Sequence, residues 1–115
     1  MPNDEIMMLK DRFVSQLSPL KVYLFGSYAY GTPNPDSDYD FYIVVDNSRF
    51  NTHEEAMNAY RAIRHVRSKP VDILVGTNKS FEERKLDGMP TIENEVYRKG
   101  ILLYDSAGSS SSPMA

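Results

Sequence analysis

Two aspartates, Asp38 and Asp40, stand two positions apart at the start of an apolar stretch with the composition of a β-strand. Side chains alternate between the two faces of a strand, so both carboxylates point the same way. Two such charges roughly 4 Å apart repel by about 4 kcal/mol at an effective dielectric constant near 20. A hard divalent cation such as Mg²⁺ between them would remove this repulsion. The alternative is that both aspartates face solvent at a loop end, with Asp38 capping a turn.

A third carboxylate, Asp72, lies between Val71 and Ile73 in a second apolar stretch. Because burial of an unpaired carboxylate is very costly, this side chain must be exposed, paired or bound to a metal. If its strand lies beside the strand of Asp40, the three carboxylates share one face of a sheet and can hold two Mg²⁺ ions. In the alternative interpretation, Asp72 lies on the solvated face of an ordinary alternating strand.

The dipeptide Gly26-Ser27 follows the apolar residues 22–25, where a strand must end and the chain must turn. Glycine permits close approach of the backbone to a ligand, and a helical turn after it would direct N–H groups toward an anion. The same dipeptide is common in strand-ending turns. By itself it therefore does not establish a phosphate-binding site.

Hydrophobic periodicity and capping patterns predict the elements that position these residues. One apolar helix face is predicted from the spacing of Ile6, Leu9, Phe13 and Leu17. Thr52 with Glu55 and Ser80 with Glu83 form capping-box patterns that predict two further helices, and a last helix is predicted over 91–99. The second of these four helices has its apolar positions at Ala56, Met57, Tyr60, Ile63 and Val66.

Four strands are predicted, at residues 22–25, 38–45, 71–75 and 101–104. The order helix–strand–strand–helix–strand–helix–helix–strand indicates an α/β (α+β) fold, with a small mixed sheet of about four strands covered by helices. The length of 115 residues fits one domain, predicted over residues 1–105. Residues 106–115 are uncharged, small and rich in serine, so we predict a disordered tail outside the fold.

The composition excludes several classes of protein. The chain has no cysteine, which rules out disulfide scaffolds, zinc knuckles and thiol catalysis. Its formal net charge of −3 argues against strong nucleic-acid binding. No apolar run approaches the length of a membrane span, and the acidic N-terminus lacks the layout of a signal peptide. We therefore expect a cytoplasmic protein with no membrane association.

Taken together, these residues resemble the nucleotidyltransferase fold of the DNA polymerase β superfamily. Most of the resemblance lies in GSYAYGTPNPDSDYDF (26–41), which contains Gly26-Ser27 and Asp38-x-Asp40, and VDILV (71–75) supplies the third acid. The ending IENEVYRKGILLYD (92–105) is similar to the usual helix–strand ending of this family. The chain is thus similar to minimal nucleotidyltransferases (MNT), including the antitoxin partners of HEPN-type ribonuclease toxins.

This resemblance implies a Mg²⁺-dependent transferase that uses ATP or another nucleoside triphosphate. Asp38, Asp40 and Asp72 would be the catalytic residues and the ligands of one or two Mg²⁺ ions, and Gly26 and Ser27 would bind the phosphates. The implied acceptor is a protein hydroxyl, such as a tyrosine of a HEPN toxin, which would receive AMP. The chain would then be an AMPylating antitoxin of a toxin–antitoxin system.

One position departs from the family pattern. Many relatives carry Arg or Lys just before the second glycine of the loop, where this chain has Tyr30 before Gly31. A cation there would help to hold phosphate. The sequence offers Lys21, Lys79 and Arg84 instead, and each is expected on the solvated surface.

Two other functions are compatible with the same residues. The chain would be a binding module if it neutralised its partner by occlusion without catalysis, although such a binder needs no cluster of repelling carboxylates. It would be a small-molecule adenylyltransferase subunit, for example one acting on an antibiotic, if another chain held the acceptor.

Overall fold

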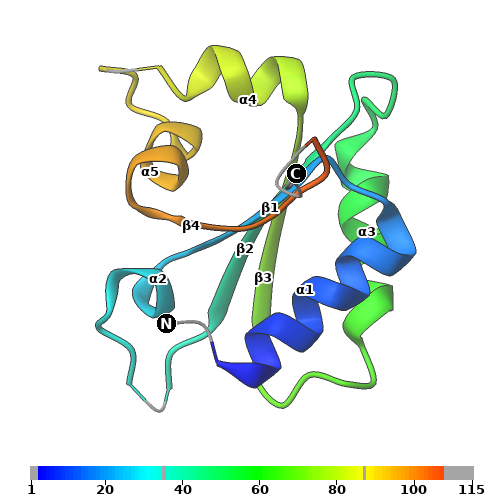
Figure 1. Cartoon of the computed structure of the whole chain (residues 1–115), viewed down its shortest axis with the longest axis vertical. Coiled ribbons are helices and arrows are strands. Elements are labelled where there is room, and N and C mark those ends of the chain that lie inside the picture. Colours follow the sequence, from blue (N-terminus) through cyan, green and yellow to red (C-terminus); the bar gives the residue numbers. More distant parts are fainter. Residues whose placement is uncertain (1–2, 35, 87, 108–115) are drawn as a thin grey trace, which may run out of the picture.

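A computed structural model describes residues 3–34, 36–86 and 88–107. Its centre is a four-stranded sheet in the order β3-β2-β1-β4 (Figure 1). The strands are β1 (Lys21–Phe25), β2 (Tyr39–Val45), β3 (Val71–Thr77) and β4 (Ile101–Asp105). β1 is antiparallel to β2 and β4, whereas β2 and β3 are parallel. The predicted α/β (α+β) architecture with a mixed sheet is confirmed.

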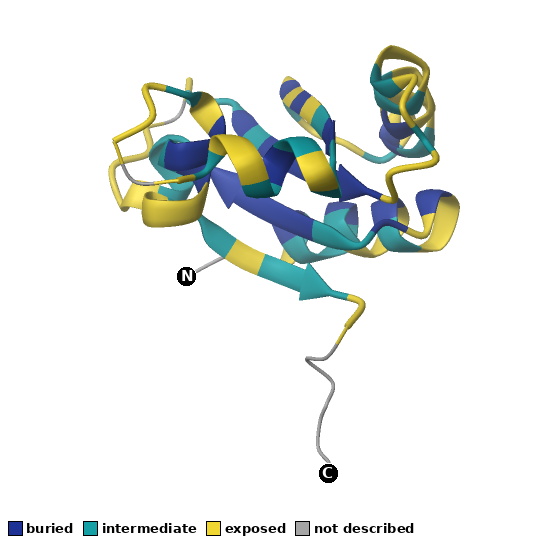
Figure 2. Ribbon diagram, turned by 90° about the horizontal axis from the view of Figure 1, so that it is seen from above, coloured by how far each residue is buried: buried dark blue, intermediate teal, exposed yellow. Residues whose placement is uncertain are grey.

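Helices cover both faces of this sheet. They are α1 (Asp4–Leu17), α2 (Ser27–Tyr30), α3 (Thr52–Ile63), α4 (Asn78–Arg84) and α5 (Ile92–Lys99). α1 and α3 enclose the larger core cluster, which includes Ile6, Phe13, Leu24, Phe41 and Ile63. α4 and α5 enclose a smaller cluster on the other face, formed by Tyr23, Phe25, Tyr42, Val44, Phe81 and Val96. β1 and β2 are buried along most of their length, whereas β4, which leads to the C-terminal end, is intermediate and exposed (Figure 2).

Short polar side chains begin the longer helices, but two of them are not the predicted ones. α3 is capped by Asn51, whose side chain accepts a hydrogen bond from the Glu54 N–H, rather than by Thr52. α4 is capped by Thr77, three residues before the predicted Ser80, because the helix starts directly where β3 ends. Asn, Thr and Ser all accept such a bond equally well, so sequence alone does not select among close candidates.

The inward face of α3 also differs from the predicted one. Ala59 and Ile63 are fully buried, whereas Met57 and Tyr60, which we expected on the apolar face, are 43% and 39% exposed. The small side chain of Ala59 lets α3 pack against α1 and β3, and this contact turns Met57 and Tyr60 outward. The helix thereby leaves an apolar strip on the surface.

The tail prediction is only partly within the described residues. The Ser106 N–H donates to the Leu20 carbonyl at 2.8 Å, so this first residue of the predicted tail is attached to the fold. Residues 108–115 lie outside the described part of the chain, and the prediction of disorder there stays a prediction. Within the described ranges, no helix is long and apolar enough to cross a membrane.

Candidate functional site

The sheet brings the three predicted carboxylates together. Asp40 lies opposite Asp72 in the parallel β2–β3 ladder, as expected if these strands were neighbours. Asp38 directly precedes β2 and is two residues before Asp40, so it belongs to the same face of the sheet as Asp40. Phe41 and Ile73, which follow Asp40 and Asp72 in their strands, belong to the core under α1 and α3. Because neighbouring residues of a strand point to opposite faces, the three carboxylates lie on the face that α4 and α5 cover.

The electrostatics of Asp40 show how close these groups are. Burial, then the charge of Asp72 and then the charge of Asp38 together raise the pKa of Asp40 from its ordinary value of 3.8 to about 6. Asp72 also lies within hydrogen-bonding reach of the Asp40 carboxyl. Asp72 itself is exposed and Asp38 is partly exposed, so the cluster opens to solvent on one side.

Gly26 is required by the position of Asp40. At the end of β1, Phe25 pairs with Asp40 across the ladder, and Gly26 follows with φ 76° and ψ −163°. This backbone conformation is essentially restricted to glycine. A Cβ atom at position 26 would lie 2.1 Å from Oδ2 of Asp40. The Asp40 carboxylate therefore occupies the space that any other residue at position 26 would fill.

A single helical turn follows this glycine. The Gly26 carbonyl accepts hydrogen bonds from the Ala29 and Tyr30 N–H groups, both at 3.0 Å, and the Ser27 carbonyl accepts one from Thr32, also at 3.0 Å. Ser27 is the first residue of α2 and is partly exposed. The predicted pair Gly26-Ser27 is thus adjacent to the carboxylates, at the end of β1. The phosphate-binding role of this pair stays a prediction.

Carboxylate oxygens are the donors that Mg²⁺ prefers, and Asp38, Asp40 and Asp72 supply them. The mutual repulsion recorded at Asp40 and the space left by Gly26 fit a cation at this position. Among the described residues, however, no three acidic or histidine side chains are already arranged around one metal position. The donor set therefore fits a Mg²⁺ ion that arrives with its own ligands, such as water and phosphate oxygens, better than a fully preformed protein cage.

Lys69 connects the two halves of the motif, and sequence reasoning missed it. Its Nζ donates to the Tyr28 hydroxyl at 2.6 Å and to the Ser37 carbonyl at 3.0 Å. It also lies 4.9 Å from the ring centre of Tyr28 and 5.2 Å from that of Tyr39. The hydrogen bond to Tyr28 is the main cause of the raised pKa of Lys69. One charged group thus fixes α2, which follows Gly26-Ser27, against the residue that precedes Asp38.

Glu5 at the start of α1 extends this network. Its carboxylate accepts hydrogen bonds from the Tyr39 hydroxyl at 2.8 Å and from the Ser68 N–H and hydroxyl, each at 2.7 Å. Burial opposes ionisation, but the hydrogen bonds from Ser68 and Tyr39 lower the pKa of Glu5 overall. Residues 68–69, which lead into β3 and Asp72, are therefore held by α1 through the bonds from Ser68 to Glu5 and by α2 through the bond from Lys69 to Tyr28.

Replacement of this lysine is expected to loosen the site without unfolding the chain. We expect Lys69→Met to weaken Mg²⁺-ATP binding at least ~10-fold, because small displacements of reacting groups have large effects. Isothermal titration calorimetry measures this affinity. Lys79→Met is the matched control, since Lys79 is exposed on α4 and the described residues give its side chain no ion pair. Equal affinities for Lys69→Met and Lys79→Met would contradict the positioning role.

The position where relatives carry a cation has a different partner here. The Tyr30 hydroxyl donates to Glu95 on α5, and burial followed by this hydrogen bond raises the pKa of Tyr30 to about 12. Lys99 on the same helix places its Nζ 5.8 Å from the centre of the Tyr30 ring. A cation from α5, Lys99, thus lies beside Tyr30, and the sequence did not indicate this contact.

The three cations considered from the sequence have other surroundings, as expected for a solvated surface. Lys21 lies 3.9 Å from Glu82, and Arg84 forms an ion pair with Glu93 at 3.1 Å. Lys79 is exposed at the start of α4, where its backbone N–H donates to Asn47. None of the three is thus placed to substitute for a cation at position 30.

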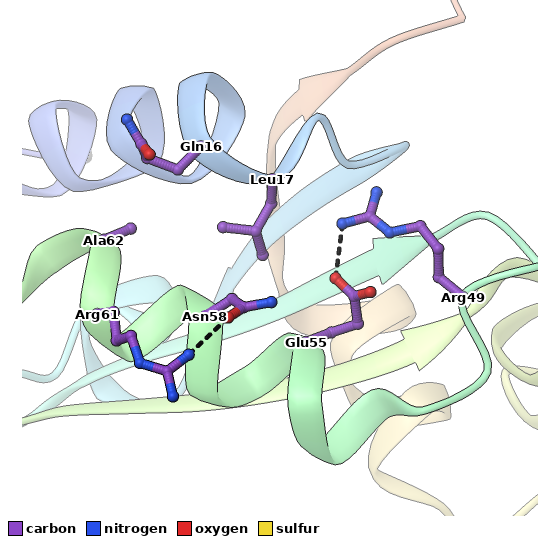
Figure 3. Close-up of a pocket in the computed structure, with 7 residues that line it drawn as sticks. All are labelled: Gln16, Leu17, Arg49, Glu55, Asn58, Arg61 and Ala62. Atoms are coloured by element: carbon purple, nitrogen blue, oxygen red, sulfur yellow. Dashed lines mark hydrogen bonds and ion pairs between the residues drawn. The ribbon is translucent and has the colours of Figure 1, made fainter.

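A pocket of about 300 Å³ lies elsewhere, between α1 and α3. Figure 3 shows that polar side chains in this pocket are paired. Arg49 forms an ion pair with Glu55 at 2.6 Å, and Arg61 donates to the Asn58 side chain at 2.7 Å. The pocket lies on the α1 and α3 side of the sheet, opposite to the carboxylates. Arg49 is already paired with Glu55, and the pocket is on the other face of the sheet, so we do not assign it to the same site.

The raised pKa of Asp40 predicts how stability depends on pH. Folded Asp40 binds its proton more tightly than unfolded Asp40, so without metal its contribution is fully present below pH 3.8 and is lost as the pH rises to about 6. After allowance for solvent screening we expect a loss of about 1 kcal/mol in the free energy of unfolding. Urea denaturation of the wild type and of Asp40→Asn at a series of pH values isolates this contribution. Parallel pH profiles for the two proteins would contradict the expectation.

Comparisons with known proteins identify a matching sequence profile and structures with a similar fold. The sequence profile described as "Nucleotidyltransferase domain" matches residues 6–103. A crystal structure from Sulfolobus solfataricus, provisionally assigned as a nucleotidyltransferase, has a TM-score of 0.62 at 20% identity, covering 89% of this chain and 78% of that one. A toxin–antitoxin structure with AMP-PNP has a TM-score of 0.56 at 19% identity, covering 91% of this chain and 76% of that one. Both share the fold. No curated protein sequence matches the chain.

Proposed function

Because the chain belongs to the nucleotidyltransferase domain family, we propose that it is a Mg²⁺-dependent enzyme that transfers AMP from ATP to a hydroxyl group. The observation that carries this proposal is the position of Asp40. Its carboxylate lies beside Asp72 and Asp38 and directly over the Cα of Gly26. A group of acids whose mutual repulsion raises the pKa of one member is expected where charge is to be bound.

Each residue has a distinct task in this proposal. Asp38 and Asp40 would hold one Mg²⁺ and, with Asp72, a second, and the bound ions would offset the triphosphate charge and lower the pKa of the acceptor hydroxyl. The backbone N–H groups at Gly26 and Ser27, with the Ser27 hydroxyl, would orient the β- and γ-phosphates. Asp72, the exposed acid, would take the proton of the acceptor. The acceptor oxygen then forms its bond to the α-phosphorus, the bond to the β-phosphate oxygen breaks, and pyrophosphate leaves.

The acceptor in this proposal is a tyrosine of a HEPN-type toxin, which would make the chain an antitoxin. Support comes from the shared fold with a toxin–antitoxin structure that holds AMP-PNP. The opening beside Asp72 also suits a macromolecular acceptor, because this carboxylate is exposed rather than enclosed.

The test uses the protein encoded by the adjacent gene as acceptor, with Mg²⁺ and ATP labelled in either the α- or the γ-phosphate. We expect label from α-labelled ATP on a tyrosine, no label from γ-labelled ATP, and no labelling with EDTA. Transfer of the γ-label would identify a kinase and overturn the proposal. Formation of a stable, neutralised complex without any label would favour occlusion in place of catalysis.

A further inference from the structure

The outer side of α3 carries a hollow of about 380 Å³ that is separate from the carboxylates and from the pocket of Figure 3, although it shares Arg61 with that pocket. Its lining residues are Met57, Tyr60, Arg61, Arg64 and Arg67. α3 packs on β3 (Figure 1), the edge strand that carries Asp72, so the residues that line this hollow belong to a helix beside that edge of the sheet. We call it the arginine surface.

The charge of this surface is unusual for the chain. The whole sequence has a formal net charge of −3, yet three guanidinium groups converge here. Within the described ranges, none of the three forms an ion pair. Arg61 donates to the Asn58 side chain and Arg67 to the Lys69 carbonyl, both neutral acceptors. The positive charge is therefore available to a carboxylate, which a guanidinium binds through two parallel hydrogen bonds.

An apolar centre lies between these charges. Met57 and Tyr60, which line the hollow, are 43% and 39% exposed. The Tyr60 ring is held in place, because its hydroxyl accepts a hydrogen bond from the Ile73 N–H at 3.0 Å. Tyrosine, methionine and arginine are the residues in which protein–protein interfaces are enriched. The apolar centre favours an acidic protein segment, which has apolar side chains to bury there, over a nucleic acid.

The arginine surface is also connected to the candidate site. Ile73, which bonds Tyr60, directly follows Asp72, and Lys69, whose carbonyl accepts from Arg67, fixes α2 against the loop before Asp38. The arginine surface and the carboxylates lie on opposite faces of the sheet but share the edge strand β3, so a segment bound here would reach Asp72 around this edge. We propose that the arginine surface binds an acidic, tyrosine-containing segment of the acceptor protein. This inference rests on the proposed function, because it names the partner of the same site.

The experiment measures binding without nucleotide, so it does not depend on catalysis. Fluorescently labelled copolymers of glutamate with tyrosine and of lysine with tyrosine are the probes, and fluorescence anisotropy gives the affinity. We expect the wild type to bind the acidic copolymer at least ~10-fold more tightly than the basic one. Arg64→Glu combined with Arg67→Glu is expected to remove this preference, and Arg64→Glu alone, which breaks no hydrogen bond recorded in the described residues, to weaken binding in the same direction.

A matched control separates a local surface from overall charge. Arg12→Glu combined with Lys79→Glu changes the net charge equally, but on α1 and α4, where both side chains are exposed. We expect this control to bind the acidic copolymer like the wild type apart from a small long-range effect.

Equal losses in both double variants, equal binding of the two copolymers, or no binding of either would overturn the inference. Tighter binding of a single-stranded oligonucleotide that also depends on Arg64 would overturn it in favour of a nucleic acid. If Mg²⁺-ATP binding failed while the copolymer result held, the proposed function would be wrong and the arginine surface would stand.

Discussion

Asp40→Asn is expected to reduce transfer of AMP at least ~100-fold while raising the melting temperature of the metal-free protein. The carboxylate contributes a metal ligand, and metal catalysis supplies several kcal/mol of barrier reduction. In the absence of metal, the same charge is repelled by Asp72 and Asp38 and is partly buried. Its removal relieves this repulsion, so one substitution changes activity and stability in opposite directions.

The two effects are measured by transfer of label from α-labelled ATP to the adjacent-gene protein and by thermal denaturation without metal at pH 7. Asp36→Asn is the matched control, since Asp36 lies exposed in the loop that leads into β2. It should leave both quantities near their wild-type values. Retained transfer in Asp40→Asn would show that the carboxylates are not the metal ligands, and a lower melting temperature would show that Asp40 has a stabilising partner.

Gly26→Ala is expected to have the second largest effect. The new Cβ would lie 2.1 Å from Asp40 Oδ2 and 2.9 Å from its Cγ, so the carboxylate must move away. The backbone conformation at φ 76° and ψ −163° adds a strain of about 1–3 kcal/mol for any residue with a Cβ. We therefore expect a lower melting temperature together with at least ~100-fold weaker Mg²⁺-ATP binding.

Gly31→Ala distinguishes the clash with Asp40 from the strain of a positive φ angle. Gly31 also has a positive φ, 82°, but a Cβ there would meet no atom within 4 Å. This variant is expected to lose stability through backbone strain, about 1–2 kcal/mol, while its affinity for Mg²⁺-ATP stays close to that of the wild type. If Gly31→Ala weakened nucleotide binding as strongly as Gly26→Ala, strain in the loop rather than contact with Asp40 would explain the effect.

The arrangement of the carboxylates followed from sequence because it depends on backbone rules. Alternation along β2 determines the shared face of Asp38 and Asp40. We assumed from the sequence that β3 lies beside β2, and the structure confirms this pairing, which places Asp72 opposite Asp40. From the sequence, the glycine at position 26 was attributed either to close approach of a ligand or to an ordinary strand-ending turn. The steric reason for this glycine, the Asp40 side chain, depends on the antiparallel register of β1 and β2, which no local pattern specifies.

Residues that act through tertiary contacts could not be found in this way. Lys69 is a single lysine before Pro70, and its sequence neighbourhood does not indicate that Tyr28 and Ser37 converge on it. The exposed strip on α3 was likewise missed, because Met57 and Tyr60 fit a helical apolar period as well as the buried residues do. Periodicity shows that a helix has an apolar face, but packing determines which part of that face is covered.

The most direct test is a crystal structure of the protein with Mn²⁺ and a non-hydrolysable ATP analogue, in which anomalous scattering locates the metal. We expect Mn²⁺ within about 2.2 Å of carboxylate oxygens of Asp38 and Asp40, a distance typical of small divalent cations with oxygen ligands. The β- and γ-phosphates should lie against the backbone of Gly26 and Ser27. A nucleotide bound elsewhere on the chain, or a metal held by the phosphates with no ligand from Asp38 or Asp40, would contradict the proposed function.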